Sequence, residues 1–368
     1  MTSGAKKIWD FYNQVPNAKI HQQEFWLMDD TLARWKNEGH INDDTDLDEL
    51  FGFDDPGKQS IDVLGWCETA FFPKFPEKVL EDRGDYELVQ DFAGRSVLCF
   101  KGRRSGFMPE YVDHPVKNID DFKEKITFRM EFENAERQAL IKERIAEVKK
   151  LRDEKGYAIE NTIIGGYMYL RSLMGPEGAL YLFYDDPDLI HLAMEKWFEL
   201  ADKTGEMAQK EIEFDEVFFA EDICYKGGSL ISPDMIREFL FPYYRKLLDN
   251  IQSRQKRKFV FQIDTDGDCR SVIPVYQELG MTYMSPFEVA SNCDVVEIRK
   301  QYPNLLMRGG IDKRILATTK EAIDAEIDRI MPFMVKRGGY IPSVDHGTPS
   351  EVSFENYTHY RKRMLGLH

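Results

Sequence analysis

Long apolar runs and paired cysteine motifs are both missing from this chain of 368 residues. No apolar run reaches the length of a membrane span, and the first residues lack a charged segment followed by an apolar one. We therefore expect no transmembrane span and no secretory signal. The five cysteines are scattered, odd in number and form no CxxC motif. This pattern argues against a disulfide framework and favours the reducing cytoplasm.

Positive charge and nucleotide-binding motifs are scarce as well. The net charge of −16 gives a field that repels nucleic acid and anionic lipid, so neither is an expected partner. The one basic cluster, SRQKRK at residues 253–258, falls where a helix is expected to end, and cations there favour the helix dipole. The chain also lacks a GxGxxG motif after a first strand, a GxxxxGK(S/T) motif and a GxSxG elbow.

A regular alternation of strand and helix signals fills the second half of the chain. With 42% hydrophobic residues, the chain is long enough for an α/β barrel that carries an extension. Helix starts are marked by Asp186 and Ser232, each followed by proline, and by Thr318 with Glu321 as a capping box. Strands are expected at residues 162–168, 216–220, 258–263, 281–284, 305–308 and 339–344. Two further strands, at 61–66 and 96–101, would complete a TIM-type (β/α)8 barrel.

The first 60 residues differ in character from the rest. They are polar and aromatic with an acidic run, and we predict an N-terminal helical extension packed on a barrel formed by residues 61–368. Two β-rich runs on either side of Ala93-Gly94 predict a hairpin insertion around residues 86–101. A charged helix then runs to Gly156, which is suited to cap it.

Acidic residues stand where several predicted strands end. Glu221 and Asp222 follow Val-Phe-Phe-Ala, and alternation along a strand predicts that one of the two points into the barrel mouth. Asp264 and Asp266 follow the next strand with a spacing that places both on one side, and Glu288 closes a third. Carboxylates gathered at one barrel mouth suit metal binding or acid–base chemistry. The alternative for each is a helix cap or a structural ion pair.

Five further residues are candidates for the same mouth. His346 follows the last strand, with Asp345 as the expected orienting partner, and an imidazole there suits a metal ligand or a proton shuttle. Arg308 precedes two glycines at a strand end and could hold a carboxylate or phosphate, or form an ion pair at the rim of the core. Tyr225 and Tyr283, together with Phe287, could line a pocket for a planar substrate or belong to the core.

Several segments taken together resemble the uroporphyrinogen decarboxylase superfamily. They include FAEDICYKGGSLISPDMIREFLFPYYRKL at 219–247, DTDGDC at 264–269, SPFE at 285–288, LLMRGGIDKRIL at 305–316 and GGYIPSVDHGTP at 338–349. The resemblance implies a TIM-type barrel with its site at the C-terminal mouth. It implies one of two chemistries: decarboxylation of uroporphyrinogen without a cofactor, or methyl transfer with zinc and a corrinoid. The decarboxylases carry an arginine-rich segment near the start, which is only faintly matched here by GRRSGFMPEY at 102–111.

The methyltransferase branch carries zinc on a His-x-Cys pair, at the position that Asp264 and Asp266 occupy in this sequence. The resemblance therefore implies a harder site, with Glu221, Asp264, Asp266 and His346 as metal ligands and zinc as the expected ion. In this hypothesis a small, possibly methoxylated donor gives its methyl group to a corrinoid protein, and the enzyme is expected to be a homodimer. Glu221, Glu288 and His346 are the predicted catalytic residues, and Tyr225, Tyr283 and Arg308 the predicted substrate-binding residues. A cofactor-free decarboxylase and a non-catalytic tetrapyrrole-binding protein are the alternatives.

Overall fold

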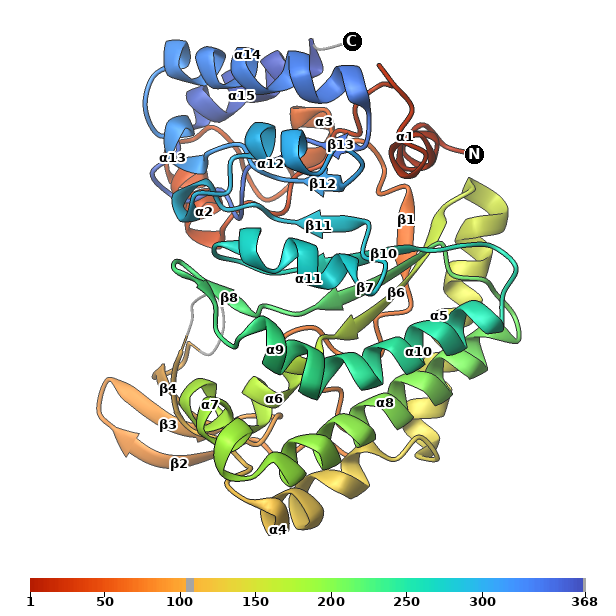
Figure 1. Ribbon diagram of the computed structural model, residues 1–368. Helices are drawn as coiled ribbons and strands as arrows, with labels where there is room; N and C mark the ends of the chain where they lie inside the picture. Colours follow the sequence, from red (N-terminus) through yellow and green to blue (C-terminus); the bar gives the residue numbers. More distant parts are fainter. Residues whose placement is uncertain (104–108, 367–368) are drawn as a thin grey trace.

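A curled parallel sheet of seven strands forms the centre of the molecule (Figure 1). The computed structural model describes residues 1–103 and 109–366. The sheet order is β1 (Lys58–Ser60), β6 (Ala158–Ile164), β7 (Glu216–Ala220), β10 (Val260–Asp264), β11 (Tyr283–Ser285), β12 (Leu306–Arg308) and β13 (Tyr340–Ile341). All neighbouring strands are parallel. Helices lie between consecutive strands, so the fold is α/β and TIM-like.

The helices that connect the strands begin mostly where the sequence signals them. The Asp186 side chain caps α8, which starts with Pro187, and Ser232 caps α9 (Pro233–Met235). The capping residue of α14 is Thr319 and not Thr318, whose hydroxyl donates back to the Ile315 carbonyl. The longer outer helices are α5 (Ala135–Lys155), α8 (Pro187–Gln209), α10 (Phe241–Ser253), α14 (Lys320–Arg337) and α15 (Phe354–Leu365). In the described ranges 1–103 and 109–366, no helix combines the length and apolar character needed to cross a membrane.

The strand predicted at residues 162–168 is placed too late. Strand β6 ends at Ile164, and Gly166–Met174 forms helix α6. The turn between them needs glycine, because a Cβ atom on Gly165 would lie 2.6 Å from the Cα atom of Glu221. The β-branched and aromatic residues around the two glycines favour a strand by composition. The chain turns here instead, because β7 lies so close to Gly165.

Of the two upstream strands predicted for the barrel, one is present and one is not. The barrel receives β1 just before the predicted range 61–66, and Leu64 within that range forms a further parallel bridge to Ile163 of β6. Residues 96–101 instead provide β4 (Ser96–Phe100), the third strand of a separate antiparallel sheet. This sheet also contains β2 (Lys78–Arg83), β3 (Tyr86–Gln90) and β5 (Glu110–Asp113), and β3 and β4 form a hairpin. Residues 104–108, part of the segment 102–111 discussed above, lie outside the described residues.

Residues 22–27 span the opening between β13 and β1. The carboxylate of Glu24 accepts from the Val344 amide, and Trp26 and Met28 exchange backbone hydrogen bonds with Thr348. On the other side, the Gln22 amide donates to the Asp54 side chain, and the Asp54 amide donates to the Gln22 carbonyl. This N-terminal segment therefore completes the barrel wall where an eighth strand would lie.

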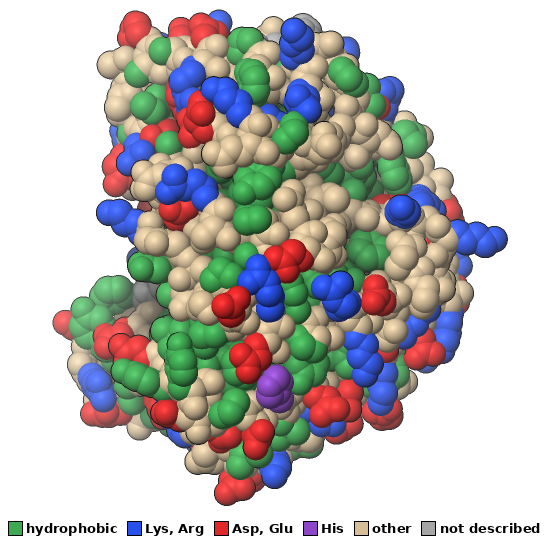
Figure 2. Space-filling model, viewed as in Figure 1, with side chains coloured by type: hydrophobic (Ala, Val, Ile, Leu, Met, Phe, Trp, Pro, Cys, Tyr) green, Lys and Arg blue, Asp and Glu red, His purple; other side chains and the backbone are tan. Residues whose placement is uncertain are grey.

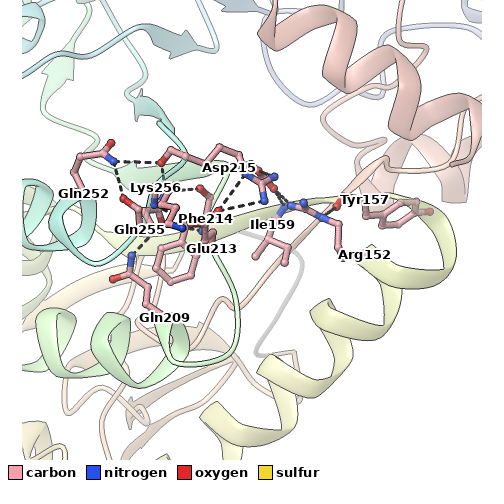
Figure 3. A network of polar contacts seen from close by, with 11 residues as sticks. Arg152, Tyr157, Ile159, Gln209, Glu213, Phe214, Asp215, Gln252, Gln255 and Lys256 are labelled. Carbon is pink, nitrogen blue, oxygen red and sulfur yellow. Dashed lines mark hydrogen bonds and ion pairs between the residues drawn. The ribbon is translucent and has the colours of Figure 1, made fainter.

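The amino ends of the strands are closed by structural contacts. Helix α1 (Ser3–Tyr12) packs Ile8 and Phe11 against Tyr283, the first residues of β6 and β12, and Ile341 of β13. Asp215, just before β7, accepts from Arg152, Arg257 and the Ile159 amide in the network of Figure 3. The basic run at 253–258 thus supplies an ion pair beneath the sheet. Contacts at this end of a barrel usually serve stability.

Candidate active site

A cavity of about 280 Å³ lies at the carboxyl ends of the barrel strands. The ends of β6, β7 and β11 point to the left side of Figure 1, where the space-filling surface of Figure 2 is hollowed. Four of the strand-end polar residues line the cavity: Asp222, Asp264, Asp266 and His346. The prediction that acidic residues from separate strands converge here with one imidazole therefore describes the geometry, with Asp222 in the place expected for Glu221.

The alternation of side chains along β7 decides which of Glu221 and Asp222 faces the cavity. Phe218, Ala220 and Asp222 line the cavity, whereas Phe219 packs outward against Trp197 of α8. Glu221 shares the outward parity. Its carboxylate accepts from the Tyr244 hydroxyl at 2.7 and 2.8 Å and from the Tyr167 amide at 3.1 Å.

Glu221 thus anchors the first turn of α6 to α10, behind the barrel wall. Its side chain is fully buried, and burial raises the pKa of this carboxyl to about 7 in spite of the hydrogen bond from Tyr244. The cavity is not lined by Glu221, so the predicted catalytic and metal-binding roles of this residue have no geometric support.

Asp264 ends β10 and is held by a chain of hydrogen bonds. Its Oδ2 atom accepts from the Ser285 hydroxyl, which in turn accepts from the Gln262 amide at 2.9 Å. Burial, with smaller contributions from the charges of Asp266 and Asp222, raises the pKa of Asp264 to about 7. The carboxyl therefore exchanges its proton near neutral pH and is suited to act as a general acid.

Asp266 and His346 form a pair on the outer side of the cavity. The His346 Nε2 atom lies 3.4 Å from an Asp266 carboxylate oxygen, and the imidazole ring meets Trp26 edge-on at 4.5 Å. Burial alone would lower the pKa of His346, but the hydrogen bond and charge of Asp266 outweigh it and raise the pKa above 6.5. The predicted partner Asp345 instead accepts from the Val289 and Lys313 amides, because its side chain faces those loops.

Strained backbone accompanies these residues. Asp222 has φ of 39° and Phe287, after β11, has φ of 62°, a region that residues with a side chain rarely adopt. Asp222 is held by Arg171 of α6, which donates to both its side chain and its carbonyl oxygen. Such strain clusters at functional sites, where the surrounding structure enforces it.

The aromatic wall of the cavity consists of residues that the sequence did not single out. Phe25 and Trp26 come from the N-terminal segment, Trp66 follows β1 and Phe218 lies in β7. Of the predicted aromatic residues, Tyr225 is 54% exposed on the β8–β9 hairpin (Cys224–Tyr225 and Gly228–Ser229), and Tyr283 faces the other end of the barrel. Phe287 is buried in the core and does not line the cavity.

Some residues of the cavity wall could have been predicted from the sequence, and others could not. Phe218 stands four positions before Asp222 and Gln262 two positions before Asp264, so the alternation of side chains along the strands would have found both. No local signal marks Phe25 or Trp26, which reach the cavity only through tertiary packing.

Arg308 and Lys58 bring positive charge to the inner end of the cavity. Both also line a second cavity of about 190 Å³ at the amino ends of the strands. The Lys58 ammonium is paired with Glu160 and Glu216, and Tyr12 donates to Glu216. Arg308 therefore lies where a substrate-binding residue was predicted, whereas Tyr283 lines only the second cavity.

Glu288 joins the loops around the mouth and does not line the cavity. Its carboxylate accepts from the Gly267 amide at 2.9 Å and lies 3.7 Å from the Lys313 ammonium. Gly267 follows Asp266, so Glu288 is placed to hold the loop that carries the Asp266–His346 pair. A direct catalytic role for Glu288 remains a prediction.

The residues of the site do not fit the predicted zinc ion. In the described ranges 1–103 and 109–366, no three His, Cys, Asp or Glu side chains are arranged to hold a metal ion. Glu221 is turned toward the helices, and Asp264 is engaged by Ser285, so the four predicted ligands do not share one centre. The reaction proposed for this site therefore assigns no step to a metal ion.

Comparison with known proteins places this geometry in a family. The chain is 27% identical to a uroporphyrinogen decarboxylase of Geobacter metallireducens over 36% of this chain and 37% of the relative. It is 25% identical to that of Pseudomonas fluorescens over 48% of this chain and 47% of the relative. The matches therefore span less than half of these curated relatives.

A solved structure matches over the whole length. A methyltransferase from Methanosarcina mazei superposes with a TM-score of 0.61, covering 100% of both chains at 13% identity, which shows a shared fold. The family model described as "Uroporphyrinogen decarboxylase (URO-D)" matches residues 106–364, well over half of the chain. This chain therefore belongs to the uroporphyrinogen decarboxylase (URO-D) family.

Proposed function

We propose that this enzyme transfers a methyl group from a small donor to a corrinoid carried by a partner protein. The observation that carries the proposal is a small cavity that Asp264 lines together with an aromatic wall, with burial raising the pKa of Asp264 to about 7. At about 280 Å³ the cavity is of the size that suits a small molecule. The fold shared with a methyltransferase agrees with this choice.

Charge at the mouth favours a reacting group that is neutral or cationic. Asp222, Asp264 and Asp266 surround the outer part of the cavity, and a substrate carboxylate placed among them would be repelled. A methyl ether or a methylated amine carries no such penalty. The aromatic side chains Trp26, Trp66 and Phe218 offer apolar surface to the body of the donor.

The chain's own residues supply acid catalysis and positioning. A reduced corrinoid supplies the nucleophile that takes the methyl group when its carrier is bound. As the bond between the methyl carbon and the donor oxygen breaks, that oxygen takes the proton of Asp264 and leaves as an alcohol or phenol. Asp264 then regains a proton from solvent, and the Asp266–His346 pair is placed to pass it on.

Decarboxylation of a small acid is the second candidate. It is favoured by the names of the curated relatives and by Arg308, which no carboxylate of the described residues pairs with. In that reaction Arg308 would hold the carboxylate, carbon dioxide would leave, and an acid would protonate the remaining carbanion.

The two candidates differ in their products. The purified chain is mixed with reduced free cobalamin and a panel of methoxyarenes and methylamines, and methyl transfer is followed by the loss of the reduced cobalamin spectrum. We expect at least one donor to be demethylated, and Asp264→Asn to abolish most of the rate. Release of carbon dioxide from small acids, with no donor demethylated, would refute methyl transfer in favour of decarboxylation. The zinc prediction is tested by elemental analysis of the same preparation.

A further inference from the structure

The positive charge at the inner end of the cavity is not neutralised equally. Lys58 is paired with two glutamates of the barrel interior. Arg308 has no ion pair with any carboxylate of the described residues, and its Nη2 atom donates to the Glu24 carbonyl at 2.9 Å. Its Nε atom is buried without a partner. A buried donor without an acceptor is costly, and an anion in the cavity would compensate it.

The orientation of Arg308 is fixed in advance. The guanidinium lies over the Phe25 ring, 4.4 Å from its centroid, and Phe25 itself belongs to the segment that completes the barrel wall. A stacked guanidinium presents its remaining donors in one plane, which matches the planar oxygens of a carboxylate.

A second unpartnered polar atom points to a ligand in the same cavity. Gln262 is only 3% exposed, and its Nε2 donates to Ser285 while its Oε1 accepts nothing from the described residues. Gln262 and Arg308 both line the cavity. The Arg308 Nε atom needs an acceptor and the Gln262 Oε1 atom needs a donor, so a ligand carboxylate would satisfy the first and a water molecule or a hydroxyl of the ligand the second.

We infer that the inner end of the cavity binds the carboxylate of a small aromatic acid through Arg308. The inference deepens the proposed function and rests on it for the role of this acid as methyl donor. The aromatic body lies against Phe25, Trp26, Trp66 and Phe218, and the methyl-bearing group then reaches the acidic outer end. Such a cavity selects by polarity: an anion at one end and a neutral or cationic group at the other.

Binding of benzoate and its neutral isostere benzamide tests the inference without turnover. Affinities are measured by titration calorimetry or by the fluorescence of Trp26 and Trp66. We expect the wild-type chain to bind benzoate about tenfold or more tightly than benzamide, because a charged hydrogen bond is worth that factor. Arg308→Gln should remove this preference while leaving benzamide binding unchanged.

Two further variants keep the test decisive. Arg144→Gln, on the outer helix α5, is the matched control and should keep the preference for benzoate. Arg308→Lys retains the charge but loses the planar fork and should show an intermediate preference even if Arg308→Gln folds poorly. Equal binding of benzoate and benzamide by the wild type, no binding of benzoate, or an unchanged preference in Arg308→Gln would overturn the inference.

The outcomes separate this inference from the proposed function. Benzoate binding that depends on Arg308, without demethylation of any donor, would leave the anion site standing and refute methyl transfer. Demethylation of neutral donors without any preference for benzoate would support methyl transfer and refute the anion site at Arg308.

Discussion

The two ends of the barrel interior hold similar charged groups in different arrangements. At the amino end, Glu160 and Glu216 share the Lys58 ammonium, and Tyr12 donates to Glu216. Burial still raises the pKa of Glu216 to about 7, whereas Lys58 outweighs burial and lowers the pKa of Glu160. Lys58, Glu160 and Glu216 are thus partnered with one another within the chain.

At the carboxyl end the acids are less completely paired. Asp264 has only a hydroxyl donor, Asp266 has a distant imidazole, and the Asp222 backbone is strained. The comparison indicates that the amino end is built to hold the barrel together and that the carboxyl end is left to meet a ligand. Substitutions at the two ends should therefore affect different measurements.

The largest effect is expected from Asp264→Asn. Loss of the general acid should lower the rate of methyl transfer by about 100- to 10,000-fold. The urea midpoint should change little, because the amide retains the size of the side chain. Asp268→Asn is the control: this residue caps the next turn and pairs with Arg270 outside the cavity, so its variant should keep the wild-type rate. Equal rates for wild type and Asp264→Asn would exclude Asp264 as the acid.

Lys58→Met tests the other end of the barrel. It leaves two buried carboxylates without their cation, and the free energy of unfolding in urea should fall by about 3–5 kcal/mol. Lys149→Met, which breaks the exposed pair of Lys149 with Glu211, should leave that free energy almost unchanged. If both variants are equally stable, the cluster around Lys58 is not a structural element.

The dependence of stability on pH should reveal the buried acids. Burial raises the pKa of Glu221 from 4.5 to about 7, so between these values the folded chain holds a proton that the unfolded chain releases. The free energy of unfolding should therefore fall as pH rises through this window, by at most about 1.4 kcal/mol per pH unit for this group. Urea titrations of Glu221→Gln from pH 4.5 to pH 7 should show a flatter slope than the wild type. An unchanged slope would mean that Glu221 is ionised in the folded state.

The smallest effect is expected from Tyr225→Ala. Tyr225 is exposed and does not line the cavity, so KM for a donor and kcat with free cobalamin should change by less than about twofold. Trp66→Ala is the contrasting variant. Trp66 lines the cavity, and its loss should raise KM about tenfold. A stronger effect of Tyr225→Ala than of Trp66→Ala would show that the cavity is not where the donor binds.

Much of the site can be predicted from the repeated strand–helix pattern and from the alternation of side chains along each strand. The strands before Asp222 and Asp264 are short, apolar and β-branched or aromatic, and parallel strands bring their carboxyl ends to one edge. Parity in β7 would also have chosen Asp222 over Glu221, because Phe218 and Ala220 face the same side as Asp222.

Other features of the fold and the cavity depend on tertiary packing, which no local sequence pattern predicts. Residues 96–101 have the composition of a barrel strand, but antiparallel partners on both sides draw them into another sheet. Trp26 and Phe25 are assigned by sequence to an outer extension and become the cavity wall only when residues 22–27 fill the opening next to β13.

That opening has a consequence for folding. The wall beside Arg308 comes from residues 22–27, and it is fastened to Thr348, a residue far along the chain. The strands of the parallel sheet pair with one another without these two segments. The cavity gains its closed side only after the two distant segments have met, so a variant that lacks Thr348 and the residues after it is expected to have an open side.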